Sequence, residues 1–287
     1  MKRIKRKINT TLWGMVTHVL GRRKKDIPIY LFCHHKTGTN LLSRVFRDIC
    51  LRERWSFVVE PYQVESPPDG DIVLFQNSTI NPRLIKTPFF GIHMIRDPRE
   101  VIVSGYFYHK KTHEPWCISK DFNQEGPPTG WPVPMFMQHK SKVWADNYIS
   151  SLGGLSYREH LNQMSQEDGM TFEMKNLSSW TIRNMLDWQY DNPSILEIKM
   201  EDVRVDYDKA FSRMFDHLEF EPRRKRISMR CARYHDVGRM SPSQLKRTVH
   251  VRTKEVATWN DHFSDDHKML FKELFGADCC SLLRYED

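Results

Sequence analysis

A strand-to-helix turn near the N-terminus constrains the fold more than any other feature of the sequence. Residues 29–33, IYLFC, form an apolar run of the length of a buried strand. Apolar residues then recur at helical spacing at Leu41, Leu42, Val45, Phe46 and Ile49. The segment between them, HHKTGT (34–39), must therefore join the end of a strand to the first turn of a helix.

Further strands and helices alternate along the chain. Strands are predicted within residues 56–61, 71–78, 89–98 and 194–202, and helices within 98–111 and 207–220. Residues 153–175 indicate a helical, polar connection. Strands that alternate with helices predict an α/β fold with a central parallel sheet flanked by helices.

The predicted organisation is a basic arm or helix over residues 1–27 and one domain over residues 28–287. The length of 287 residues and an apolar content of 39% are sufficient for one large core. The stretch from about 110 to 140 is rich in Pro and Gly yet contains Trp116, Trp131 and Phe136. We interpret this stretch as a binding lid.

The positive charge lies mostly at the N-terminus. Of the formal net charge of +8, nine basic residues and no acid fall in residues 1–25, which leaves 35 basic against 36 acidic residues elsewhere. A uniformly basic face is therefore excluded, and we expect no nucleic-acid partner. A second cluster, residues 221–235, could serve an anionic ligand.

The N-terminal segment and the cysteines indicate a cytoplasmic setting. The uncharged run of residues 8–21 is too short to span a bilayer, and no cleavage site of the secretory type follows it. Weak contact with a membrane surface stays an alternative for this arm. The six cysteines are scattered without a regular framework, which favours a reducing compartment.

The predicted turn has the chemistry of an anion site. A helix N-terminus presents unpaired N–H groups and the positive end of the helix dipole. Gly38 permits close approach, Lys36 adds charge, and the hydroxyls of Thr37 and Thr39 add donors. Phosphate is the expected ligand, and a plain turn is the alternative. A standard triphosphate loop would place the lysine after the glycine, so ATP hydrolysis is disfavoured.

A metal site at this turn is disfavoured, and a second anion site lies further along the chain. Adjacent strand residues point to opposite faces, so His34 and His35 cannot easily hold one ion. Arg96 ends a buried strand, and Ser104 lies eight residues later on the predicted helix. Both could bind one anion. A surface pair of Arg96 with Asp97 or Glu100 is the alternative.

Four motifs in this order resemble the sulfotransferases that use 3'-phosphoadenosine 5'-phosphosulfate (PAPS). HHKTGTNLL (34–42) is similar to the family's 5'-phosphosulfate loop, and RDPREVIVSGYFYH (96–109) to its 3'-phosphate element. Residues 195–220 resemble the family's late strand, turn and helix. Residues 251–276 resemble the closing R-K-G segment. The resemblance covers most of residues 28–287 and implies a P-loop-like sulfotransferase fold.

The resemblance also implies ligand contacts. PAPS, and its product PAP, would be bound by Lys36, Thr37, Gly38, Thr39, Asn40, Arg96, Ser104, Arg252, Thr253 and Lys254, without a metal. The sequence departs from the family at Leu41 and Met200, which replace aromatic residues, and at Thr253–Lys254, which replaces Lys-Gly.

The expected activity is in-line transfer of the sulfuryl group to a hydroxyl or amine of a small molecule. Lys36 would stabilise the charge of the leaving group. Glu60 is the predicted catalytic base, with His109 and His93 as reserves, because the region of the family's usual histidine has none. A carbohydrate or glycolipid acceptor, a nucleotide-dependent kinase, a non-catalytic binder and a homodimer stay open.

Overall fold

The structure is a computed structural model that describes residues 25–61, 63–78, 80–120, 142–241, 243 and 258–286. The chain divides into two compact units, Met1–Arg96 with Trp188–Ser241 and Asp97–Asp187 with Pro242–Asp287. The predicted arm is described only from residue 25 onward. A single domain over residues 28–287 stays a prediction.

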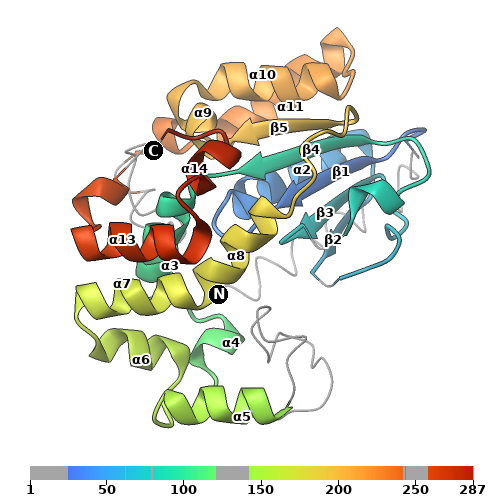
Figure 1. Ribbon diagram of the computed structural model, residues 1–287. Coiled ribbons are helices and arrows are strands. Elements are labelled where there is room, and N and C mark those ends of the chain that lie inside the picture. Colours follow the sequence, from blue (N-terminus) through green and yellow to red (C-terminus); the bar gives the residue numbers. More distant parts are fainter. Residues whose placement is uncertain are drawn as a thin grey trace. The chain divides into compact units, whose positions relative to one another are not determined.

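The first unit is built on a five-stranded sheet in which every pairing is parallel (Figure 1). The strand order is β2-β3-β1-β4-β5. The strands are β1 (Ile29–Cys33), β2 (Phe57–Glu60), β3 (Ile72–Gln76), β4 (Phe90–Ile95) and β5 (Ile195–Lys199). All five lie where the apolar runs predicted strands, so the predicted α/β class is confirmed. The arrangement is consistent with a P-loop-like sulfotransferase fold.

Helices of the first unit pack on one face of this sheet. They are α2 (Thr39–Glu53), α9 (Met200–Val205), α10 (Tyr207–His217) and α11 (Pro222–Tyr234). The unit also contains the 3-10 helices η1 (Pro82–Leu84) and η3 (Val237–Arg239). α10 packs against α9 and α11, and α11 packs against α2. The predicted helices after β1 and β5 are therefore confirmed.

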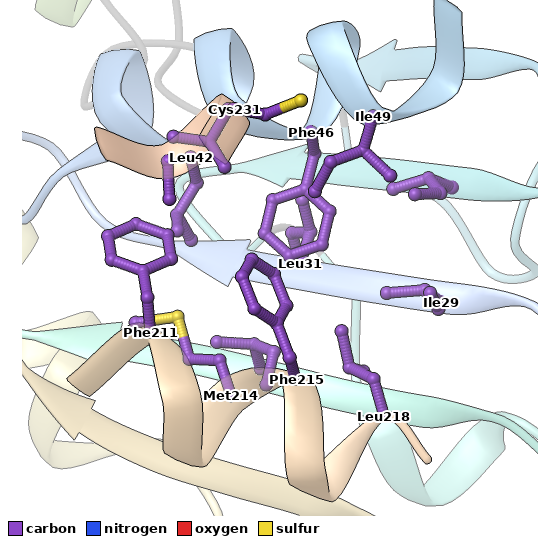
Figure 2. Packing of buried hydrophobic residues seen from close by; sticks show 14 of the residues in the cluster. Ile29, Leu31, Leu42, Phe46, Ile49, Phe211, Met214, Phe215, Leu218 and Cys231 are labelled. Carbon is purple, nitrogen blue, oxygen red and sulfur yellow. The ribbon is translucent and has the colours of Figure 1, made fainter. Parts of the chain in front are cut away.

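Side chains of β1 alternate between two cores. Ile29 and Leu31 face the helical side, where they meet apolar residues of α2 and α10. Figure 2 shows this core, with labelled contributions from Leu42, Phe46, Ile49, Phe211, Met214, Phe215, Leu218 and Cys231. Tyr30 and Phe32 point to the opposite face and join an aromatic cluster with Phe75. Burial on both faces explains why the strand lacks polar residues.

The second unit is helical within its described residues. Its helices are α3 (Pro98–His109), α4 (Pro115–Ile118), α5 (Lys142–Ser151), α6 (Tyr157–Gln163), α7 (Gln166–Lys175), α8 (Leu177–Leu186), α13 (Asp265–Phe275) and α14 (Cys279–Leu282), with the 3-10 helix η4 (Trp259–Asp261). α3 begins at a proline whose preceding residue, Asp97, caps the helix by accepting from the Arg99 N–H. The helical connection predicted at 153–175 is confirmed as α6 and α7. None of the described helices has the length and apolar character needed to cross a bilayer.

Candidate functional site

The carboxyl edge of the sheet in the first unit is the natural place for a ligand site. After β1 the chain adds β2 and β3 on one side of that strand, and after β3 it adds β4 and β5 on the other. Such a reversal leaves a crevice outside the carboxyl ends of the strands. The turn after β1 and the residue after β4 lie at this point, so the reversal brings together two of the predicted anion-binding segments.

The backbone of the turn after β1 is shaped for close approach. Lys36 has a positive φ of 66° and Gly38 a φ of 125°. A Cβ on Gly38 would lie 2.3 Å from the Sδ of Met94 and 3.4 Å from that of Met200, so glycine is required here. Gly38 is also the N-cap of α2 and provides no side-chain cap. The first turn of this 15-residue helix therefore presents its N–H groups at the turn.

Two threonines that were expected to donate to a ligand bind the turn itself. The Thr37 hydroxyl accepts from the His34 N–H at 2.9 Å and donates to the His34 carbonyl at 3.0 Å, and Thr37 is fully buried. The Thr39 hydroxyl lies 3.4 Å from the same carbonyl. Thr37 thus braces the turn from inside, which corrects the expectation that its hydroxyl faces a phosphate. Asn40 is exposed on the first turn of α2.

Arg96 reaches the turn from the neighbouring strand. It follows β4, its side chain is 7% exposed, and its Nη1 donates to the Lys36 carbonyl at 3.2 Å. The two acids of the alternative surface pair each have partners of their own in the second unit. Asp97 is buried and binds Arg99, and buried Glu100 accepts from the Trp259 N–H.

Ser104, the predicted partner of Arg96, is half-buried on α3. It belongs to the second unit, whereas Arg96 belongs to the first. Their joint binding of one phosphate therefore stays a prediction. Arg252, Thr253 and Lys254 lie outside the described residues, as do Trp131 and Phe136 of the predicted lid.

A strained segment on the other side of β1 was missed by reasoning from sequence. Asn77 and Ser78 follow β3 and have φ values of 68° and 52°. The Ser78 hydroxyl donates to the Cys33 carbonyl at 3.1 Å, which ties this segment to the end of β1. Non-glycine residues with positive φ gather at functional sites. The polar run after an apolar strand, QNS, was the available signal.

Glu60, the predicted base, is the last residue of the edge strand β2 and is half-buried. Its partner in register is Phe75 of β3. Two strand spacings separate β2 from β1, or about 10 Å along the edge. The carboxylate therefore belongs to the same edge as the turn, and its catalytic role stays a prediction.

His109 and Trp116 belong to the core of the second unit. The His109 side chain is fully buried, and its Nδ1 lies 2.8 Å from the carboxylate of the equally buried Glu173. Trp116 is 6% exposed and packs edge-on against the His109 ring. Both side chains are therefore held among described residues of the second unit. The roles of His109 as a reserve base and of Trp116 as a lid aromatic stay predictions.

The two adjacent histidines of the turn have different surroundings. His34 is buried and its ring faces the ring of His93, while His35 is half-buried.

Burial raises the pKa of the neighbouring Cys33 thiol to about 12, so this thiol is not a ready metal ligand or nucleophile. Within the described part of the chain, no three His, Cys, Asp or Glu side chains gather as a metal site would require.

Comparisons with known proteins give structural likenesses but no match by sequence. No family model matches the chain, and no curated protein matches its sequence. Among solved structures, mouse sulfotransferase SULT7A1 complexed with PAP aligns over 96% of this chain and 92% of its own, with a TM-score of 0.46 and 15% identity. The α/β class stated above depends on the chain's own sheet rather than on this likeness.

Proposed function

We propose that the protein is a PAPS-dependent sulfotransferase that transfers a sulfuryl group to a hydroxyl or amine of a small molecule. The observation that carries this proposal is the turn at the point where the sheet reverses. A lysine, a glycine whose φ other residues rarely adopt and a helix N-terminus meet there, and Arg96 donates to the Lys36 carbonyl. The four sequence motifs support the same activity.

Sulfuryl transfer is an in-line displacement at sulfur. The S–O bond to the departing bisphosphate breaks while the acceptor oxygen or nitrogen forms a new bond to sulfur, and negative charge grows on the bridging oxygen. Lys36 and the N–H groups at the start of α2 are the donors for that oxygen. Because these donors are fixed before the reaction, they favour the transition state.

The acceptor must also lose a proton, and Glu60 is the proposed base. Its strand ends on the same edge as the turn, about 10 Å away, which leaves room for a sulfuryl group and an acceptor between them. A positioned base typically contributes about 100- to 10,000-fold to the rate. Ser104, Arg252, Thr253 and Lys254 are proposed to hold the 3'-phosphate, as the resemblance implies.

The proposal includes a small-molecule acceptor, a cytoplasmic location, no metal and no nucleic-acid partner. A carbohydrate or glycolipid acceptor is the alternative substrate class, and a nucleotide-dependent kinase is the alternative activity. The kinase alternative requires ATP with magnesium. The order of Lys36 and Gly38 opposes it, because the triphosphate loop places its lysine after the glycine.

Calorimetry with PAP tests the proposal. The full chain should bind PAP, and Lys36→Ala should weaken binding about ten- to a hundredfold, as expected for the loss of a hydrogen bond to a charged group. Lys209→Ala, at an exposed lysine of α10, is the matched control and should bind normally. Binding of ATP with magnesium but not of PAP by the wild type would contradict the proposal.

A further inference from the structure

Three side chains, at or just beyond the ends of adjacent strands or within them, form a hydrogen-bonded series that ends at the turn. His93 of β4 and Glu197 of β5 are partners in register, and His93 Nδ1 lies 2.5 Å from Glu197 Oε2. His34, one residue beyond β1, places its Nε2 2.9 Å from the Nε2 of His93. The two histidines are at most 1% exposed. All three residues belong to the first unit.

Trp188 holds both His93 and Glu197 in place. Its ring lies 4.2 Å from the His93 ring, centroid to centroid, at an interplanar angle of 31°. Its Nε1 donates to Glu197 Oε1 at 3.2 Å. The carboxylate of Glu197 therefore meets donors at both oxygens, and its orientation is set from two directions.

The hydrogen-bond roles follow from the partners. Burial lowers the pKa of His93, and burial together with the nearby His93 lowers the pKa of His34, so both rings are neutral. The Nδ1–H of His93 must donate to Glu197, which leaves His93 Nε2 as an acceptor. His34 must then donate from Nε2. Its Nδ1 is an acceptor that is buried without a hydrogen-bond partner among the described residues.

The same His34 supports the turn through its backbone. Its N–H donates to the Thr37 hydroxyl, and its carbonyl accepts from the N–H and the hydroxyl of Thr37. The ring is thus anchored in the core while the backbone carries the turn that presents Lys36. Because ring and bracing backbone belong to one residue, the hydrogen bond that anchors the ring restrains where that backbone can lie.

We propose that His34, His93 and Glu197 act as positioning residues that hold the phosphate turn in its ligand-binding shape. Glu197 sets the tautomer of His93, His93 sets the tautomer and orientation of His34, and His34 sets the turn. The inference rests on the proposed function only in that PAP is the ligand used to test it. None of the three residues is proposed to touch the substrate.

Nitrogen-15 NMR of the histidine rings tests the hydrogen-bond roles of His34, His93 and Glu197 without any ligand. At pH 7.5 the wild type should show His93 as the Nδ1–H tautomer and His34 as the Nε2–H tautomer. Glu197→Gln keeps the shape but supplies an amide donor, so His93 should change to Nε2–H and His34 to Nδ1–H. An imidazolium at His34, or unchanged tautomers in the variant, would overturn the inference.

PAP binding and the turn amides test the positioning. Glu197→Gln should weaken PAP binding about tenfold, the lower range for loss of an orienting partner, and should shift the backbone amide signals of residues 35–39. Glu65→Gln, at an exposed glutamate of the same unit, should change neither. Restored affinity in Glu197→Asp would confirm that the carboxylate is what matters.

The outcomes separate the two proposals. If the wild type binds PAP and Glu197→Gln binds it equally well, the positioning inference fails and the proposed function stands. If the wild type does not bind PAP, the proposed function fails. The histidine tautomers and the turn amides then still decide whether His34, His93 and Glu197 hold the turn in shape. Unmoved amide signals at residues 35–39 in Glu197→Gln would then overturn the inference.

Discussion

Each unit pairs buried histidine with a glutamate, but the two groups differ in how completely their hydrogen bonds are satisfied. In the second unit, Glu173 accepts from His109 Nδ1 and from the hydroxyls of Tyr157 and Ser178, each at 2.8 Å. In the first unit, the chain that begins at Glu197 ends at a His34 nitrogen with no hydrogen-bond partner among the described residues. The Glu173 group lies within a helical core, whereas the Glu197 group ends at the turn.

The difference shows how a structural cluster can be told from a site. Burial raises the pKa of Glu173, but the nearby His109 and the hydrogen bonds lower this pKa by more than burial raises it. The pKa of Glu173 is therefore below its ordinary value. Such a carboxylate is ionised and fully paired, and a fully paired group contributes to stability. A buried nitrogen without a partner costs free energy, and such a cost is expected where function requires it.

The largest expected effect comes from removing the centre of the satisfied cluster. Glu173→Ala leaves the partners of a buried carboxylate unpaired and should lower the free energy of unfolding by about 3–5 kcal/mol. Urea denaturation measures this loss, and Glu273→Ala, at an exposed glutamate of α13, is the control. A loss in Glu173→Ala no larger than in the control would remove the contrast between the two units.

A smaller loss of stability, with a large loss of binding, is expected at the turn. Gly38→Ala forces a Cβ against Met94 at a φ that alanine rarely adopts, which should cost about 1–3 kcal/mol of stability. The same change displaces the N–H groups at the start of α2, so PAP binding should be lost. Gly153→Ala is the matched control, since Gly153 also has a positive φ but a Cβ added there would meet nothing within 4 Å. Normal PAP affinity in Gly38→Ala would show that the turn tolerates displacement.

The smallest expected effect is a difference in the pH range over which the two groups lose their contribution to stability. Both His34 and His93 have a pKa below the ordinary 6.5, so the unfolded chain binds protons first as the pH falls. Their contribution to stability is complete above about pH 6.5 and is lost as the pH falls toward their folded pKa values. Glu173, with a pKa lowered from 4.5, contributes above pH 4.5 and loses its contribution below it.

Urea midpoints between pH 7.5 and 4 measure this dependence. Glu197 and Tyr190 are the other titratable groups whose side chains contact His93, so both stay unchanged in the comparison. His93→Phe should flatten the decline between pH 6.5 and 5, and Glu173→Gln should flatten the decline below pH 4.5. Identical profiles in wild type and His93→Phe would show that groups other than His93 and His34 cause the decline.

The sheet could be predicted from the sequence because each strand has a local signal. All five apolar runs became strands, and the glycine of the turn after β1 has the positive φ that a tight turn requires. The face of α3 could not be predicted in the same way. This helix is apolar along most of its length, so its sequence does not tell which side chains it buries, and the pair of His109 with Glu173 was not predicted.

The buried histidine chain depends on the order of the strands. His34 and His93 are 59 residues apart, and Glu197 lies 104 residues beyond His93. Only the placement of β4 between β1 and β5 aligns the three side chains on one face. Thr37 is a similar case, because a hydroxyl within a turn can face either the ligand or the turn's own backbone, and only the fold decides between them.

The two thioethers that pack against Gly38 make the turn sensitive to methionine oxidation. A Cβ at this glycine would lie 2.3 Å from the Sδ of Met94, and Met200 lies just beyond, half-buried. Conversion of either methionine to its sulfoxide adds a polar oxygen to a flexible apolar side chain. Met94 is fully buried, so the half-buried Met200 is the thioether that peroxide reaches first. Its sulfoxide oxygen would compete for the space that the glycine leaves open, so peroxide would damage ligand binding without touching a charged residue. A methionine sulfoxide reductase would then restore the turn.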